Sequence, residues 1–187
     1  MQPGRVIVVT GLPGTGKSTL ARELAARYRM PVLAKDFIKE PLLDVLGAGD
    51  AMESRRLSDA SFAIQFRLAA EWARGGHAFI LEGNFRPGEH ERPLLDALAS
   101  AQLAQVLCRV PEAVRLTRLA ARQNHSSRHA GHRLGERVNQ GDAFLDLPWG
   151  RFVHESGVHH TVLAALDHWL NLSAASPSPS RSSEPSR

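Results

Sequence analysis

Gly11-Leu12-Pro13-Gly14-Thr15-Gly16-Lys17-Ser18 is the most informative segment of this sequence. Its spacing, a glycine and four residues followed by Gly-Lys-Ser, is that of a P-loop. The context agrees, because Arg5 to Thr10 is a short β-branched apolar run that predicts a strand, and Lys17 to Arg29 predicts a helix. Glycines at these places let backbone N–H groups close around phosphate oxygens, and the helix start adds a positive dipole. The segment therefore predicts a cradle for the phosphates of ATP or GTP.

The side chains of this loop predict separate roles in nucleotide binding. We expect Lys17 to neutralise the β- and γ-phosphates, and so to act in catalysis as well. The Ser18 hydroxyl is predicted to bind Mg²⁺. Further contacts to the nucleotide are assigned to the neighbouring residues Gly11, Leu12, Pro13, Gly14, Thr15, Gly16 and Thr19. The expected small ligands are thus ATP and Mg²⁺.

Strand-like and helix-like segments alternate along the rest of the chain. Apolar runs at 32–34, 78–81 and 105–110 predict strands, with a weaker candidate at 151–154. Periodic segments predict helices at 37–46, 54–74, 89–100, 111–123 and 160–170. This alternation predicts an α/β protein with a five-stranded parallel sheet between helices. We expect one domain over residues 1–172 and a disordered Ser- and Pro-rich tail at 173–187.

Size and composition fit a soluble protein of the cytoplasm. The chain has 187 residues, of which 43% are hydrophobic and 22% charged, and its apolar runs are far shorter than the roughly 20 residues of a transmembrane helix. No membrane partner is therefore expected. Cys108 is the only cysteine, so no internal disulfide can form, and its apolar neighbours predict a buried strand position.

The charge pattern bears on the choice of partner. The net charge is +4, and seven arginines with only two glutamates lie between Arg109 and Arg137. One basic segment beside a nucleotide site is explained by ATP phosphates, although a short single-stranded nucleic acid is an alternative partner. The pattern leaves a monomer or a homodimer equally open.

Two acidic residues stand at the ends of predicted strands. Asp36 follows the run 32–34, and we interpret it as a general base that accepts the proton of an acceptor hydroxyl. The alternative is that Asp36 only N-caps the helix beginning at Phe37. Glu82 ends the run Ala-Phe-Ile-Leu, where it could order the Mg²⁺ shell, and its alternative role is that of a surface carboxylate.

Lysine occurs only at Lys17, Lys35 and Lys39, in a chain that otherwise uses arginine for positive charge. All three lie near the predicted phosphate and acceptor positions, which favours specific roles over chance. Lys39 is a candidate contact to the acceptor. Arg86, four residues after Glu82, is a candidate for holding an acidic acceptor, and exposure without function is the alternative.

Three arginines, Arg115, Arg118 and Arg122, recur at a spacing that places them on one helix face. Such a row can clamp a nucleotide and its transferring phosphate, and we assign Arg118 to nucleotide binding. The alternative is an ordinary solvated basic face. Arg128, in the polar stretch that follows, is the candidate for a mobile catalytic arginine.

On the basis of these residues, the sequence resembles the small P-loop kinases of the AAA_33 type. They include chloramphenicol phosphotransferase, zeta-toxin-like kinases and the polynucleotide 5′-hydroxyl kinase domain. The resemblance spans about Arg5 to Arg137 and rests on the P-loop and the segments 36–40, 80–83, 118–122 and 128–132. It implies a P-loop NTPase fold of the nucleoside-kinase type with a short lid at about 122–137. It also implies that Asp36 is the catalytic base and that Arg122 and Arg128 hold phosphate during transfer.

Together these observations predict an ATP- and Mg²⁺-dependent kinase that phosphorylates a hydroxyl of a small molecule. One rival is a polynucleotide 5′-hydroxyl kinase, which salt-sensitive binding of oligonucleotides would reveal. Another is a nucleotide-dependent switch that transfers no phosphate and would tolerate Asp36→Asn. The acceptor itself is left open by the sequence.

Overall fold

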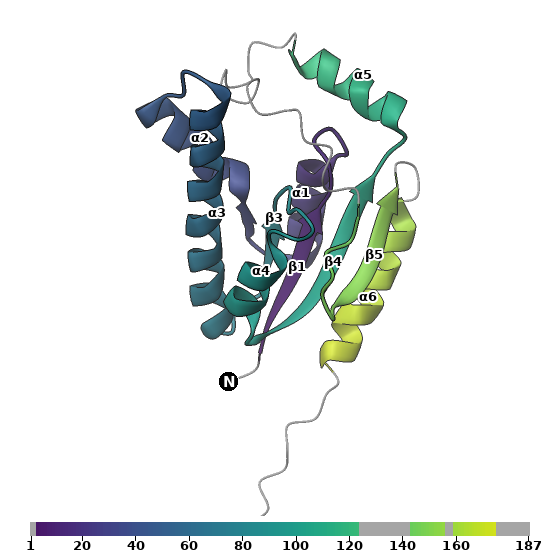
Figure 1. The fold of residues 1–187 in the computed structure, drawn as a ribbon. Helices are drawn as coiled ribbons and strands as arrows, with labels where there is room; N and C mark the ends of the chain where they lie inside the picture. Colours follow the sequence, from purple (N-terminus) through teal and green to yellow (C-terminus); the bar gives the residue numbers. More distant parts are fainter. Residues whose placement is uncertain (1–2, 124–142, 156–158, 175–187) are drawn as a thin grey trace, which may run out of the picture.

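A computed structural model describes residues 3–123, 143–155 and 159–174. Strands and helices alternate along these ranges, as expected for βαβ units, except that two consecutive helices separate the second strand from the third (Figure 1). In chain order they are β1 (Gly4–Thr10), α1 (Lys17–Tyr28), β2 (Val32–Ala34), α2 (Lys35–Leu46), α3 (Ala51–Arg74), β3 (Phe79–Glu82), α4 (Glu91–Leu98), β4 (Ala101–Arg109), α5 (Glu112–Gln123), β5 (Gly150–Glu155) and α6 (His159–Ala174).

The strands form one sheet in the order β2-β3-β1-β4-β5, and every pairing is parallel. Central β1 pairs with β3 through Val9 and Glu82, and with β4 through Val9 and Val106. Both faces of a parallel sheet must be covered by other elements, and here helices cover them, as the side chains of β1 show. Val6 and Val8 pack toward α3 and α4, whereas Ile7 and Val9 pack toward α1 and α6. The predicted five-stranded parallel sheet between helices is confirmed.

The element bounds differ from the predicted ones where local contacts outweigh the sequence pattern. α3 begins at Ala51, three residues early, because the Asp50 side chain accepts a hydrogen bond from the Glu53 N–H at 2.8 Å. β4 begins at Ala101 instead of 105, because its first residues pair with Gly4 and Arg5 of β1. The weaker fifth strand is present as β5, parallel to β4.

The C-terminal helix passes the predicted end of the domain. α6 continues to Ala174, two residues beyond residue 172, while residues 175–187 of the predicted tail lie outside the described ranges. Within the described residues, no helix is long and apolar enough to cross a membrane. Cys108 is buried as expected, and burial raises the pKa of its thiol to about 12.

Candidate functional site

Several of the predicted site residues lie at one end of the sheet, where three parallel strands end. β1 leads into the P-loop, β2 leads into α2, and β3 ends on Glu82. Because Glu82 is in register with Val9 of β1 and Ala34 of β2, it stands between the P-loop and the start of α2. The carboxyl ends of parallel strands are where open α/β sheets bind their ligands.

The P-loop depends on backbone conformations that favour glycine. Gly11, Gly14 and Gly16 have φ angles of 137°, 88° and 98°. A Cβ atom on Gly11 would lie 2.4 Å from the backbone carbonyl oxygen of Cys108, so β4 itself excludes a side chain there. Within the loop, Thr15 Oγ1 donates to the Leu12 carbonyl at 2.8 Å, and Lys17 Nζ donates to the same oxygen at 3.0 Å. The loop is thus closed over the N-terminus of α1.

Gly11→Ala is expected to lower the free energy of unfolding by about 1–3 kcal/mol, because alanine strains the backbone and meets the Cys108 carbonyl. Gly47→Ala is the matched control, since Gly47 also has a positive φ of 70° but no heavy atom lies within 4 Å of its Cβ position. Urea unfolding of the two variants isolates the contact with β4. Equal stability of the two would show that this contact does not shape the loop.

Lys17 and Glu82 form the charged centre of the site. Burial lowers the pKa of the Lys17 ammonium, and the Glu82 carboxylate nearby acts in the opposite direction. Burial raises the pKa of Glu82, opposed by Lys17 and by a hydrogen bond from the Ser18 hydroxyl. Glu82 is only 4% exposed, which rules out the alternative of a surface carboxylate.

The contact between Ser18 and Glu82 bears on the predicted metal. A hydroxyl and a carboxylate that meet beside a phosphate loop form an all-oxygen donor set, which is what Mg²⁺ prefers. Across residues 3–123, 143–155 and 159–174 there is no cluster of three or more His, Cys, Asp or Glu side chains that could hold a metal ion without help. The set therefore fits an ion that also binds substrate phosphates and water, as Mg²⁺ does.

Gln65 of α3 is a part of the site that the sequence analysis missed. Its amide Nε2 donates to the carbonyl of Leu33 at 2.8 Å and to the carbonyl of Glu82 at 2.9 Å. It thereby joins the carboxyl ends of β2 and β3 and fixes the backbone of Glu82. A polar residue between the buried apolar residues Phe62 and Ala69 was the available signal.

Asp36 lies in the first turn of α2, not at its cap. The helix begins at Lys35, its N-cap is Ala34, and no side chain caps it. The alternative interpretation of Asp36 as an N-cap is therefore wrong, because the chain turns directly from β2 into α2. The side chain of Asp36 is 49% exposed, and one carboxylate oxygen lies 3.2 Å from Lys35 Nζ.

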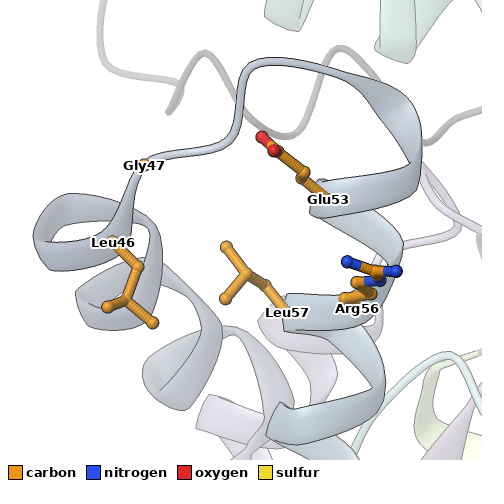
Figure 2. A pocket seen from close by; sticks show the side chains of 5 residues that line it. All are labelled: Leu46, Gly47, Glu53, Arg56 and Leu57. Atoms are coloured by element: carbon orange, nitrogen blue, oxygen red, sulfur yellow. The ribbon is translucent and has the colours of Figure 1, made fainter.

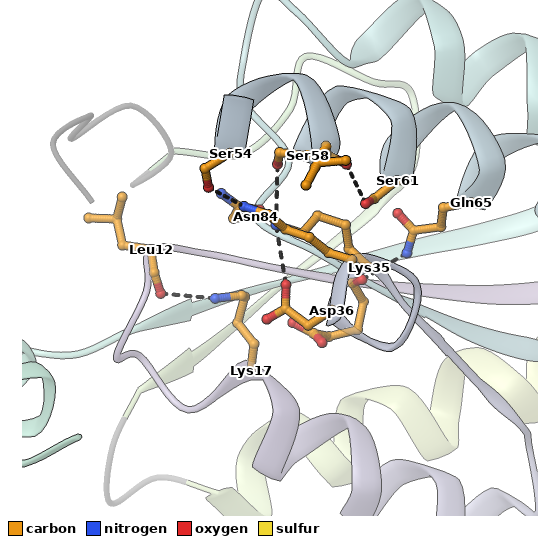
Figure 3. A network of polar contacts seen from close by, with 12 residues as sticks. Leu12, Lys17, Lys35, Asp36, Ser54, Ser58, Ser61, Gln65 and Asn84 are labelled. Carbon is orange, nitrogen blue, oxygen red and sulfur yellow. Dashed lines mark hydrogen bonds and ion pairs between the residues drawn. The ribbon is translucent and has the colours of Figure 1, made fainter. Parts of the chain in front are cut away.

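Lys35 anchors Asp36 to two other elements (Figure 3). Its ammonium donates to Asn84 Oδ1 at 3.3 Å and to Ser58 Oγ at 3.5 Å, besides its ion pair with Asp36. It also lies 5.5 Å from the centre of the Phe62 ring. A buried lysine with these partners holds the start of α2 against α3 and the segment after β3, and so places Asp36.

Lys39 is buried and Arg86 is largely buried. Lys39 Nζ donates to Ser54 Oγ at 3.1 Å, and burial, reinforced by Lys35, lowers its pKa to about 8. Arg86 has a side chain only 11% exposed and pairs with Glu89 at 3.0 Å and with Asp59 at 3.9 Å. The alternative of an exposed Arg86 is therefore wrong.

Helix α5 reaches the P-loop through two of its arginines. Arg115 is buried and its side chain packs against Gly14, while Arg118 Nη1 lies 3.5 Å from the Gly14 carbonyl. The predicted contact of Arg118 with the nucleotide stays a prediction, but its position beside the loop agrees with it. The Arg122 side chain, Arg128 and the lid beyond residue 123 lie outside what the structure describes.

A hollow of about 220 Å³ lies elsewhere, at the turn between α2 and α3 (Figure 2). It is lined by Leu46, Gly47, Glu53, Arg56 and Leu57, none of which is a predicted site residue. We therefore place the candidate site at the strand ends and not in this hollow.

Comparison with known proteins agrees with this geometry. A family model described as an AAA domain, AAA_33, matches residues 6–148 and so covers the sheet from β1 to β4 together with the P-loop. The chain belongs to the AAA_33 family. This match includes Lys17, Asp36 and Glu82, the residues that the fold brings to one edge.

Solved structures show the same fold as this AAA_33 protein. A Chloroflexus aurantiacus protein described as a "putative kinase" is 28% identical, has a TM-score of 0.79, and aligns over 92% of this chain and 98% of its own. The Mycobacterium tuberculosis APS kinase CysC, solved with AMPPNP and APS, is 21% identical with a TM-score of 0.55, over 91% and 99% of the two chains. The fold is that of the P-loop kinases, of the nucleoside-kinase type.

Among curated proteins, the uncharacterized protein Rv2004c of Mycobacterium tuberculosis is 34% identical over 88 residues, or 43% of this chain. The aligned part spans only 18% of that relative's length. The similarity therefore concerns a segment of a much longer protein.

Proposed function

We propose that this AAA_33 protein transfers the γ-phosphoryl group of ATP to a hydroxyl of a small molecule. One observation carries the proposal: three adjacent strands end side by side, and the residues that follow or end them include Lys17 and Ser18, Glu82, and Asp36. A P-loop that only binds nucleotide does not need a half-exposed carboxylate beside it, whereas transfer to a hydroxyl needs a base. The fold shared with proteins described as kinases supports the proposal.

The P-loop and α5 would hold the nucleotide. Backbone N–H groups from Gly11 to Thr19 would surround the phosphates, Lys17 would neutralise the β- and γ-oxygens, and the Arg118 guanidinium would approach from α5. The hydroxyl of Ser18 and the carboxylate of Glu82 would hold Mg²⁺, which neutralises phosphate charge as it develops. In this proposal Arg122 and Arg128 hold the phosphate during transfer.

Asp36 would prepare the acceptor. Its carboxylate accepts the proton of the acceptor hydroxyl while that oxygen forms a bond to the γ-phosphorus and the bond from phosphorus to the β,γ-bridging oxygen breaks. ADP leaves with the electron pair of that bond. Lys35 keeps the Asp36 carboxylate in place through the contact of 3.2 Å.

The test is transfer of labelled γ-phosphate from ATP with Mg²⁺ across a panel of sugars, sugar acids, nucleosides, aminoglycosides, chloramphenicol-type antibiotics and 5′-hydroxyl oligonucleotides. A labelled small molecule, absent when Asp36→Asn replaces the wild type, is the expected result. Labelled oligonucleotides alone would favour the polynucleotide kinase. Release of free phosphate alone, across the whole panel, would overturn the kinase proposal in favour of a nucleotide-dependent switch.

Glu82→Gln is expected to raise the Mg²⁺ concentration needed for half-maximal turnover by about 10- to 100-fold, because an amide removes the negative charge from a buried ligand. The measurement is a Mg²⁺ titration at saturating ATP. Glu71→Gln, an exposed carboxylate of α3, is the matched control. An unchanged Mg²⁺ requirement would exclude Glu82 from the metal site.

A further inference from the structure

The interface between α2 and α3 buries two lysine side chains, Lys35 and Lys39, that have few negatively charged partners. Lys39 is only 5% exposed, yet its ammonium has three protons to donate and its partner is the neutral hydroxyl of Ser54, at 3.1 Å. Among the residues that the structure describes, no carboxylate forms an ion pair with it. Burying a charge in this way is unfavourable unless an anion compensates it.

The neighbours of Lys39 increase this imbalance. Lys35 lies one turn earlier on the same face of α2, and its electrostatic effect on Lys39 is unfavourable. Arg86 is also largely buried. Its Nη2 pairs with Glu89 at 3.0 Å and with Asp59 at 3.9 Å, while its Nε has no hydrogen-bond partner among the described residues. The acids that pair with Lys35 and Arg86 are exposed to solvent, with side-chain exposures of 49% for Asp36, 57% for Asp59 and 40% for Glu89, so water screens them. The buried charges between α2 and α3 are therefore the ammonium groups of Lys35 and Lys39.

On the α3 side of this interface, hydroxyl groups face the two lysines (Figure 3). Ser54 and Ser58 are four residues apart on α3, so they lie on one face of the helix, and they contact Lys39 and Lys35. Asn84, after β3, adds an amide to the same group through Lys35. Ammonium groups beside hydroxyls and an amide are suited to a small polar anion.

We propose that the acceptor is a hydroxy compound that carries an acidic group, a carboxylate or a phosphate, and that this group pairs with Lys39. The inference rests on the proposed function, because it assumes that Asp36 receives the reacting hydroxyl. Asp36 and Lys39 are three residues apart on α2, a rise of roughly 4.5 Å along the helix axis. An acceptor that reaches both has the size of a sugar acid or a sugar phosphate.

The electrostatics of Lys39 agree with this assignment. Its pKa is lowered to about 8, and the charged groups that face it are Lys35 and Asp36 from α2 and Asp59 from α3. Asp36 and Asp59 raise the pKa of Lys39, and an anionic ligand bound beside the ammonium would raise it further. Because the ammonium loses its proton above pH 8, binding of an acidic compound should weaken by about tenfold from pH 7 to pH 9.

The experiment measures binding by calorimetry to the full chain with Mg²⁺ and a non-hydrolysable ATP analogue. The probes share one carbon skeleton: a sugar acid, the corresponding sugar phosphate and the neutral sugar. We expect an acidic probe to bind at least tenfold more tightly than the neutral one. The carboxylate and phosphate probes distinguish the two kinds of acid.

Variants separate a binding role for Lys39 from a structural one. Lys39→Met should weaken binding of the acidic probe by at least tenfold and that of the neutral sugar by less than threefold, and it should remove the loss of affinity between pH 7 and pH 9. Lys39→Arg keeps the charge and should retain most of the affinity. Arg67→Met, on the exposed surface of α3, removes the same charge and should change neither.

The results distinguish this inference from the kinase proposal. A failure of every acidic probe to bind, or an equal loss for acidic and neutral probes in Lys39→Met, overturns the inference even if a neutral sugar is phosphorylated. Binding of an acidic probe that depends on Lys39, without phosphoryl transfer to it, supports the anion site at Lys39 and counts against the kinase proposal. Thermal unfolding of Lys39→Met and Lys39→Arg checks that both variants fold.

Discussion

Lys17→Ala is expected to lower phosphoryl transfer by about a thousandfold or more. The ammonium of Lys17 is held over the P-loop by its bond to the Leu12 carbonyl, and it lies close enough to Glu82 to influence its pKa. A cation at this place is positioned before the nucleotide arrives, so its removal takes away stabilisation of charge on the transferring phosphate. The measurement is the single-turnover rate with labelled ATP and the best acceptor of the panel.

The control for this change is Arg92→Ala, an exposed cation on α4 paired with Asp96. Its transfer rate should stay within twofold of the wild type. Transfer by Lys17→Ala at the rate of the wild type would exclude the P-loop as the catalytic site. A rate that falls only in proportion to ATP affinity would limit Lys17 to binding.

Asp36→Asn is expected to lower the rate of transfer by about a hundredfold or more, while ATP affinity stays within threefold. Asparagine preserves the shape of the side chain and can still accept a hydrogen bond from Lys35, but it cannot take the proton of a hydroxyl. Transfer and ATP affinity should respond differently because Asp36 lies in the first turn of α2, after β2, whereas the P-loop follows β1.

Stopped transfer with unchanged binding of a fluorescent ATP analogue is the result that supports a base. Asp44→Asn makes the same substitution on an exposed residue of α2 and should leave both quantities unchanged. If Asp36→Asn reduced ATP affinity as strongly as turnover, Asp36 would serve the fold or the metal and the proposed base would be wrong.

Much of the fold follows from short-range patterns. The strand before the P-loop and the helix after it are each encoded within about a dozen residues, so local propensity and glycine spacing are enough to predict them. The boundaries were less accurate where long-range pairing decides them. β4 starts at Ala101 because β1 lies beside it, and no local pattern carries that information.

The candidate site also contains positions that the sequence predicts and others that only long-range packing decides. The positions of Lys17, Ser18 and Glu82 could be predicted because each lies in the P-loop or at the end of a strand, and strand ends converge in a parallel sheet. Their roles stay predictions. The role of Gln65 could not, since it depends on α3 packing across the ends of two strands that come from different parts of the chain.

By itself, the sequence determined the class of this protein: a P-loop between a strand and a helix, within an alternation that requires a parallel sheet. Glycines at positive φ and apolar runs between helices are constraints that act over a few residues, so they can be recognised in the sequence alone. Only the tertiary structure decided that Arg86 is largely buried and paired with Glu89, that Asp36 is held by Lys35 and that Lys39 contacts Ser54. Burial and charge pairing depend on which helices pack together, and that is set by the order of the strands in the sheet.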